Sequence, residues 1–141
     1  MDQSEIVFLD ANVLFTAAYN PLGLAASLIR QRRRLHLEMV TSTYVVNEAL
    51  HNLQLKNPEK MKNLKEILLH VSVKEVCWEE NFNPLHLPLD DAPIFHAALV
   101  TKSTHLLTGD LKAFGPWMNK PKMTCGILIQ TVRHFVDQRI L

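Results

Sequence analysis

Short apolar runs alternate with longer segments in which apolar and polar residues recur at helical spacing along most of this chain. The apolar runs predict buried strands at residues 6–9, 35–40, 71–77, 104–110 and 123–129. The segments between and after them predict helices at residues 11–19, 24–34, 41–56, from 57 onward, at 90–102 and at 131–138. Strands that alternate with helices indicate a parallel sheet covered by helices on both faces, and therefore an α/β fold.

Turn and capping residues support the boundaries of several predicted elements. Residues 20–23 read NPLG, which is typical of a turn between two helices. Residues 41–43 are hydroxyl-bearing and suit the start of a helix, and Pro58 suits the first position of the next one. The stretches 78–89 and 114–122 carry prolines and no regular pattern, and they predict loops.

The composition is that of an ordinary globular protein, with 48% hydrophobic residues in 141 and a formal net charge of +1. A chain of this length predicts one domain spanning residues 1–141. No apolar stretch approaches the ~20 residues that cross a bilayer, and no signal peptide is evident. We therefore expect a soluble, cytoplasmic protein with no membrane partner.

The cysteines and histidines show no spacing typical of a metal site. Cys77 and Cys125 form no CxxC motif, and the seven histidines show no HExxH or other paired spacing. The apolar neighbours of both cysteines predict that their thiols lie in the core.

Three aspartates occupy similar places relative to the predicted strands. Asp10 follows the first strand, Asp110 follows the fourth, and Asp91 opens the helix at 90–102. The carboxyl ends of parallel strands meet at one edge of a sheet, where open α/β folds bind their ligands. We therefore expect Asp10 and Asp110 to be neighbours if their strands are neighbours, with Asp91 entering at the same edge.

Glu48 is a fourth candidate, in the middle of the helix at 41–56. It lies off the main apolar stripe, on a second stripe with Tyr44, His51 and Leu55. Two partly apolar stripes predict that this helix is covered on more than one side. A carboxylate on the second stripe then faces a cleft.

Each acid also has an ordinary structural explanation. Asp10 and Asp91 suit helix capping, Glu48 suits a solvated helix face, and Asp110 suits a turn. Asp90 stands beside Asp91, and spacing alone does not decide which of the two is the functional acid.

Electrostatic repulsion decides what four converging acids require. Two carboxylates ~4 Å apart repel by about 4 kcal/mol at an effective dielectric constant of ~20. Several of them need protonation or a divalent cation between them. Oxygen ligands suit Mg²⁺ or Mn²⁺, and carboxylate-bound Mg²⁺ commonly binds substrate phosphates. Converging acids would therefore indicate a metal-dependent nuclease.

The four acids in their contexts resemble the PIN-domain family. The matching segments are FLDANVL (8–14), VVNEAL (45–50), DAPIFHAAL (91–99) and LLTGDLKAF (106–114), which sample nearly the whole chain in the family's order. The resemblance implies an α/β/α sandwich around a central parallel sheet of about five strands. It also implies a ribonuclease that hydrolyses RNA with water activated by one or two Mg²⁺ or Mn²⁺ ions.

The resemblance assigns a role to six residues. It makes Asp10, Glu48, Asp91 and Asp110 the catalytic acids and metal ligands. Asn12 matches the small polar position two residues after the first acid, where it would orient Asp10 or a bound water. Thr108 matches the hydroxyl residue before the last acid and would support the metal ligands. No further acid follows Asp110, so four acids complete the predicted site.

Basic and aromatic residues outside the acid motifs are candidates for RNA binding. They are Arg30, Arg32, Arg33 and Arg34 near the end of one predicted helix, and Trp117, Lys120 and Lys122 in the loop at 114–122. Arginines can bind phosphates and tryptophan can stack on a base. The structural alternatives are a solvated helix end and a tryptophan that packs its loop against the core.

Several functions compete with one another. Small stand-alone PIN domains are often VapC-like toxins, so an antitoxin protein and a homodimer are the implied partners besides RNA. The alternative is a non-catalytic PIN-like module that binds RNA or protein. A phosphatase using Asp10 as nucleophile is disfavoured because Asn12 replaces the second acid such enzymes need. A Rossmann cofactor enzyme is disfavoured because no GxGxxG follows the first strand.

Overall fold

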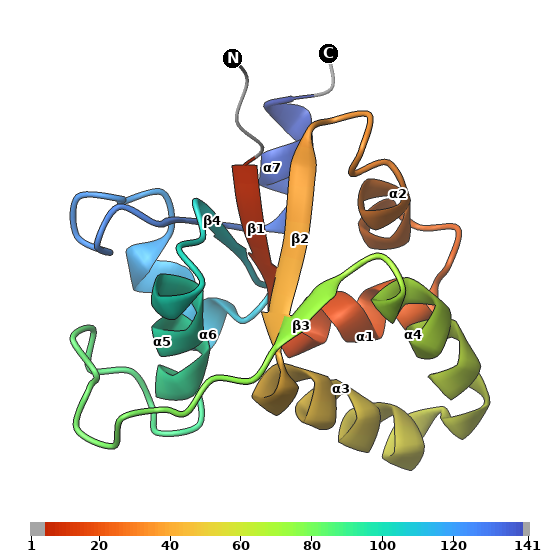
Figure 1. Cartoon of the computed structure of the whole chain (residues 1–141), viewed down its shortest axis with the longest axis horizontal. Coiled ribbons are helices and arrows are strands. Elements are labelled where there is room, and N and C mark those ends of the chain that lie inside the picture. The colour runs from red at the N-terminus through yellow and green to blue at the C-terminus, as the bar shows by residue number, and fades with distance from the viewer. Residues whose placement is uncertain (1–4, 140–141) are drawn as a thin grey trace.

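A five-stranded parallel sheet forms the centre of the computed structural model, which describes residues 5–139 (Figure 1). The strands are β1 (Glu5–Leu9), β2 (Leu37–Ser42), β3 (Ser72–Lys74), β4 (His105–Leu107) and β5 (Leu128–Gln130). The α-helices are α1 (Ala11–Tyr19), α2 (Leu24–Arg30), α3 (Thr43–Lys56), α4 (Met61–Leu68), α5 (Ala92–Val100), α6 (Leu111–Phe114) and α7 (Val132–Asp137). Two short 3₁₀ helices are η1 (Pro58–Lys60) and η2 (Gly115–Trp117).

The strand order places β1 at the middle of the sheet. The order is β3-β2-β1-β4-β5, and every pairing is parallel. Val7 of β1 pairs with Met39 of β2 on one side and with His105 of β4 on the other. The chain thus builds outward from β1 to β3 and then crosses to β4 and β5. Open α/β sheets bind ligands where the strand order reverses, which here is the carboxyl edge between β1 and β4.

Helices cover both faces of this sheet. Figure 1 shows α1, α3 and α4 to one side of the strands and α5 and α6 to the other. Val7, Phe8 and Leu9 of β1 are completely buried. A strand buried on both faces is apolar at successive positions, which explains why residues 6–9 show no alternation of polar and apolar side chains. The predicted parallel sheet and its layered fold are confirmed.

The helix predicted at 24–34 is shorter in the structure. α2 ends at Arg30, and residues 31–36 form hydrogen-bonded turns that lead into β2. The backbone N–H of Arg32 donates to the oxygen of Ile29, only three residues back, so the regular helical pattern is lost there. His36 falls in the predicted strand, but its backbone has a positive φ of 57°, which a strand does not allow. β2 consequently begins at Leu37, two residues later than predicted.

The C-terminal part of the chain also differs from its prediction. Most of the strand predicted at 123–129 is a turn, since Cys125 and Gly126 have φ values of 57° and 87°, and β5 begins only at Leu128. The segment predicted as a loop at 114–122 begins with the last residue of α6 and then η2. Cys77 and Cys125 are both exposed, so the prediction of buried thiols was wrong.

Membrane-spanning potential in residues 5–139 is limited to one bent pair of helices. No single helix there has the length and apolar character to cross a membrane. α1 and α2 meet those criteria only when taken together, across a bend of 98°.

Candidate active site

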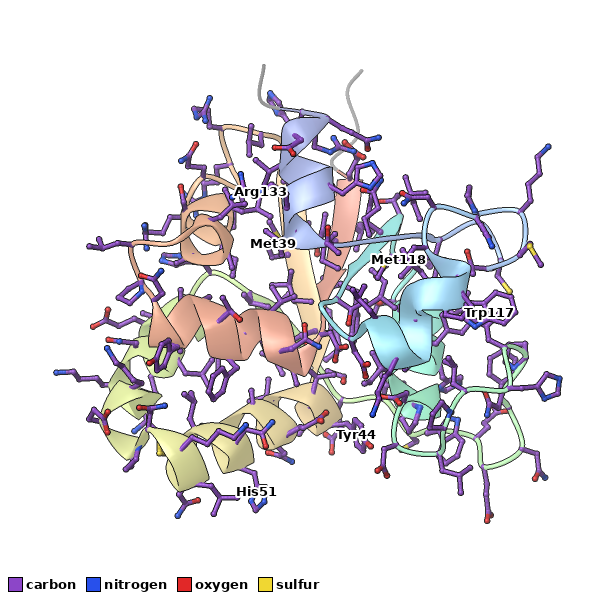
Figure 2. The ribbon with its side chains drawn as sticks, turned by 180° about the vertical axis from the view of Figure 1, so that it is seen from behind. Met39, Tyr44, His51, Trp117, Met118 and Arg133 are labelled. Atoms are coloured by element: carbon purple, nitrogen blue, oxygen red, sulfur yellow. The ribbon has the colours of Figure 1, made fainter. Side chains whose placement is uncertain are left out.

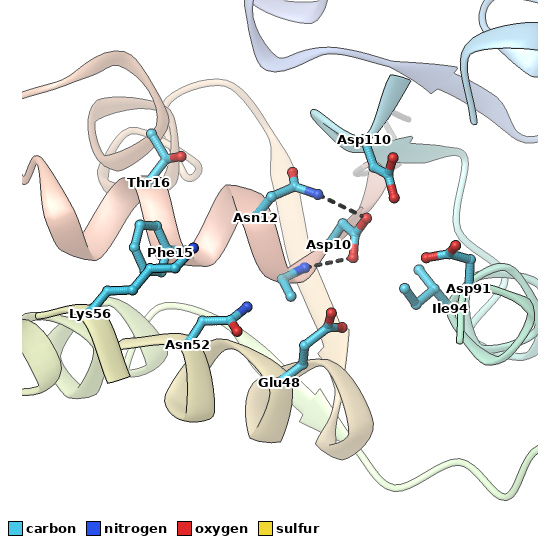
Figure 3. A pocket seen from close by; sticks show the side chains of 11 residues that line it. Asp10, Asn12, Phe15, Thr16, Glu48, Asn52, Lys56, Asp91, Ile94 and Asp110 are labelled. Atoms are coloured by element: carbon cyan, nitrogen blue, oxygen red, sulfur yellow. Dashed lines mark hydrogen bonds between the residues drawn. The ribbon is translucent and has the colours of Figure 1, made fainter. Parts of the chain in front are cut away.

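A pocket of about 200 Å³ opens at the carboxyl edge of the sheet, beside the ends of β1 and β4. The four acids singled out in the sequence, Asp10, Glu48, Asp91 and Asp110, all line it. Figure 3 shows their carboxyl groups turned toward one another across the pocket. The acids come from four different parts of the chain, so only the folded protein brings them together.

Asp10 lies at the base of the pocket, between the end of β1 and the start of α1. Its side chain is only 2% exposed. The backbone N–H of Ala11 donates to Oδ1 at 2.7 Å, and the Thr108 hydroxyl donates to Oδ2 at 2.7 Å. The Asn12 amide also donates to Oδ2, at 3.2 Å. These bonds fix the direction in which the remaining oxygen lone pairs of Asp10 can bind.

Asn12 and Thr108 together tie the end of β1 to the end of β4. The Asn12 amide nitrogen donates to the Thr108 hydroxyl at 3.3 Å, and its oxygen accepts the backbone N–H of Gly109 at 2.6 Å. Thr108 is completely buried and accepts the backbone N–H of Asp110 at 3.0 Å. A Cβ at Gly109 would lie 3.2 Å from the Asn12 oxygen, so the close approach favours glycine there.

Capping accounts for two of the aspartates and leaves the third free. The Asp10 side chain caps α1, and Asp110 Oδ1 accepts the backbone N–H of Ala113 at 3.1 Å in α6. Asp91 occupies the N-cap position of α5, but its side chain makes no capping hydrogen bond. The capping explanation therefore fails for the carboxylate of Asp91.

The structure also separates Asp91 from Asp90. Asp91 is half-buried and lines the pocket, whereas Asp90 is exposed and does not. Tyr44 of α3 donates its hydroxyl to the backbone oxygen of Asp90 at 2.8 Å. This bond anchors the segment before α5 against α3 and helps to hold Asp91 at the pocket.

Glu48 reaches the pocket from α3, although the reason given for its position was wrong. Figure 2 shows its companions Tyr44 and His51 along the outer side of α3. Tyr44 is 41% exposed and Leu55 is 70% exposed, so the second stripe of this helix is not covered. The pocket-facing residues are instead Glu48, Asn52 and Lys56, which recur every four residues.

The charges of these acids perturb one another. Burial raises the pKa of Asp10, and the charge of Asp110 raises it further. The hydrogen bonds from Thr108 and Ala11 act in the opposite direction and lower it. Partial burial, followed by the charges of Asp110 and Asp10, raises the pKa of Asp91 from 3.8 to about 6. Partial burial and the charge of Asp10 also raise the pKa of Glu48. The site concentrates negative charge and would gain stability from a cation.

The donor set fits a hard divalent cation, since it consists of carboxylates with no thiol or imidazole. Within residues 5–139, no three His, Cys, Asp or Glu side chains stand close enough to ligate one ion together. Mg²⁺ commonly binds through one or two carboxylates and keeps several waters. The arrangement therefore fits an ion that takes a subset of the four acids as direct ligands.

The basic and aromatic candidates from the sequence do not line this pocket. Arg33 and Arg34 lie in the turns before β2, at the opposite edge of the parallel sheet. Arg30 donates to the backbone oxygen of Pro21 at 2.7 Å. Trp117 is half-buried against the core and lies beside α6 in Figure 2. Lys120 is exposed in the turns after η2.

The pocket contains residues that the sequence reasoning missed. Phe15 and Thr16 of α1 and Asn52 and Lys56 of α3 line it beside the acids. The spacing of Asn52 and Lys56, four and eight residues after Glu48, placed them on the same helical face and was the available signal.

Comparisons with known proteins find similarity of structure and none of sequence. No family model matches the chain, and no curated protein matches its sequence. The structure is similar to a chain of VapBC2 from Rickettsia felis bound to a DNA fragment from their promoter, with a TM-score of 0.58 and 16% sequence identity. The match covers 89% of this chain and 98% of that one.

A second solved structure gives the same result. It is VapBC-1 from nontypeable Haemophilus influenzae, with a TM-score of 0.56 and 16% identity over 91% of this chain and 98% of that chain. At this level of identity the likeness establishes the fold. The α/β/α PIN-like fold expected from the sequence is confirmed.

Proposed function

We propose that this chain, which has a VapC-like PIN fold, is a metal-dependent endoribonuclease that hydrolyses RNA phosphodiester bonds. One observation carries the proposal: Asp10, Glu48, Asp91 and Asp110 line a single pocket at the point where the strand order reverses. A purely structural role gives no reason to gather four acids there, because each raises the energy of the others in the ionised state.

The four acids are the proposed ligands of one or two Mg²⁺ or Mn²⁺ ions. Such an ion, when bound, supplies activation of a water for attack on phosphorus and neutralisation of the leaving oxygen. Asp10 is the principal ligand, because its burial and three hydrogen bonds hold it in one orientation. Asn12, at the start of α1, and Thr108, after β4, maintain that orientation through their hydrogen bonds to Oδ2. A carboxylate not used as a ligand can accept a hydrogen bond from the attacking water and hold it in place.

The two similar structures, which are VapBC complexes, support the proposal of a protein partner. We extend to this chain the role of toxin in a toxin–antitoxin pair, with an antitoxin protein as its partner and cytoplasmic RNA as its substrate. The homodimer expected from the family resemblance belongs to the same proposal.

A ribonuclease assay tests the proposed activity. Purified wild-type protein is incubated with single-stranded RNA in Mn²⁺ and in EDTA, beside Asp10→Asn, Asp91→Asn and the control Asp137→Asn. Asp137 is exposed on α7, outside the pocket. Each pocket substitution should lower the cleavage rate by more than about 100-fold, since residues that merely orient metal ligands contribute roughly 10–100-fold. Cleavage that survives EDTA, or either pocket substitution, would overturn the proposal.

A further inference from the structure

The acidic pocket continues away from the acids, along the groove between α1 and α3. Asn12 and Phe15 line it from α1, and Glu48, Asn52 and Lys56 line it from α3. Figure 3 shows Phe15 and Lys56 at one end of the pocket and Asp91 and Asp110 at the other. The groove therefore runs from a negative end, through the amide of Asn52, to an aromatic and positive end.

Two aromatic rings and two lysines extend this positive end. Phe15 and Tyr19 lie one turn apart on α1, and their rings stack with centroids 6.0 Å apart and planes 8° from parallel. The ammonium group of Lys56 lies 5.7 Å from the centroid of the Phe15 ring, and that of Lys60 lies 5.7 Å from the centroid of the Tyr19 ring. We call Phe15, Tyr19, Lys56 and Lys60 the aromatic–lysine strip.

The strip is accessible and its charges are available. Tyr19 is 50% exposed and Lys56 is exposed. Within residues 5–139, neither Lys56 nor Lys60 forms a salt bridge with a carboxylate. Cation–π contacts at exposed sites are weak, so a phosphate can draw these ammonium groups away from the rings at small cost.

We propose that the aromatic–lysine strip binds the single-stranded RNA that flanks the bond to be cleaved. Lys56 and Lys60 bind backbone phosphates, and the exposed ring of Tyr19 stacks on a base beside Phe15. Binding without base-specific hydrogen bonds is typical of single-strand sites that combine cations with aromatic rings. This inference rests on the proposed function, because it assigns the substrate of the acidic pocket to the groove that continues from it.

Charge complementarity favours RNA as the occupant of this groove. An RNA phosphate at the acidic end requires a metal ion between it and the carboxylates. The neighbouring phosphates would lie at the strip, which carries lysines where the other end of the pocket carries acids, so they are attracted and not repelled. Arg33 and Arg34 offer no equivalent, since they lie at the opposite edge of the sheet.

RNA binding measured without cleavage tests the strip. Fluorescence anisotropy of a labelled, unstructured oligoribonucleotide is followed in the Asp10→Asn background at several salt concentrations. The further substitution of Lys56→Ala with Lys60→Ala should reduce the slope of log K against log [salt] by about 1.4, since each phosphate contact to a single strand contributes roughly 0.7. Lys62→Ala with Lys65→Ala, which removes two lysines of α4 outside the pocket, should leave the slope unchanged.

Tyr19→Ala provides a second readout that does not depend on charge. It should weaken RNA binding roughly fivefold or more, as expected for the loss of one stacked base, without changing the salt slope. Thermal melting of each variant verifies that it is folded. Equal effects of the two lysine pairs, or no effect of the Lys56/Lys60 pair and of Tyr19→Ala, would overturn the inference and leave the strip as packing or as a surface for a protein partner.

The wild-type cleavage assay separates this inference from the proposed function. Cleavage by wild type with unchanged RNA affinity in the strip variants contradicts the inference alone. RNA binding that requires the strip, with no cleavage by wild type in Mn²⁺, supports the strip and contradicts the proposed function.

Discussion

Asp10 illustrates how one residue serves both structure and proposed chemistry. Its carboxylate caps α1 through Ala11 and receives hydrogen bonds from Thr108 and Asn12. Hydrogen bonds to the ionised form favour it, while burial opposes it and raises the pKa. Capping and metal binding are therefore compatible, since the cap uses one oxygen direction and leaves other lone pairs toward the pocket.

The pKa of Asp91 predicts how this residue affects stability. The folded-state pKa of about 6 lies above the ordinary value of 3.8, so between these values the folded protein holds a proton that the unfolded chain has lost. Stability consequently falls as pH rises through this window, and the penalty stays constant above it. In metal-free buffer at about pH 7.5, Asp91→Asn removes this penalty. It should raise the free energy of unfolding by about 1 kcal/mol, after solvent screening of a half-exposed group is allowed for.

Urea unfolding at two pH values measures this effect. At about pH 3.5, where the Asp91 carboxyl is largely protonated in both the folded and the unfolded state, the wild type and Asp91→Asn should have similar stability. The conservative change Asp137→Asn, outside the pocket, should show no such pH-dependent gain. A variant that is less stable than wild type at the higher pH would contradict the account of Asp91.

At the scale of elements, α3 carries Glu48, Asn52 and Lys56 into the groove. Its start is fixed by Ser42, whose buried hydroxyl accepts the backbone N–H of Val45 at 3.3 Å. Loss of this cap leaves a buried donor without its partner.

The cap of α3 gives a second stability prediction. Ser42→Ala should lower the free energy of unfolding by about 1 kcal/mol, which is typical for loss of an N-cap hydroxyl. The neighbouring Thr43→Ala is the control, since that hydroxyl is exposed and reaches the backbone oxygen of Lys74 only at 3.5 Å. Thermal or urea unfolding compares the two, and an equal loss in both variants would show that Ser42 does not act as the cap.

Most of the elements could be predicted because their signals are local. The helix at 11–19 was predicted with the bounds that α1 has, and five parallel strands were expected and found. The errors occur where the backbone departs from the hydrophobic pattern. Residues 35–40 and 123–129 carry the hydrophobic pattern of strands, but His36, Cys125 and Gly126 adopt positive φ values that no periodicity reveals.

The site was predictable in part for a related reason. Asp10 and Asp110 follow parallel strands, so chain topology alone brings them to one edge, and the pairing of β1 with β4 makes them neighbours. Phe15 and Lys56 join the pocket only because α1 packs beside α3. Local spacing places Lys56 on the helical face of Glu48. It does not encode the helix packing that brings Phe15 beside that face, which depends on side chains distant in sequence.

At the scale of the whole molecule, a formal net charge of +1 conceals a separation of charge. Four acids meet at the carboxyl edge of the sheet, while Arg33 and Arg34 lie at the amino edge. A local field of this kind can select a ligand that the net charge does not predict. The homodimer and the antitoxin stay predictions from the family resemblance and the similar structures.

Calorimetric titration of metal-free protein with Mn²⁺ near neutral pH tests the central claim most directly, since the proposed chemistry needs a divalent cation held in this pocket by a subset of its acids. The wild type and the Asp137→Asn control should bind Mn²⁺ with equal affinity. The double variant Asp10→Asn/Asp91→Asn should bind more than about 100-fold more weakly, because even residues that only orient metal ligands contribute roughly 10–100-fold. No Mn²⁺ binding by the wild type, or equal binding by the double variant, would contradict the assignment of this pocket as a metal site.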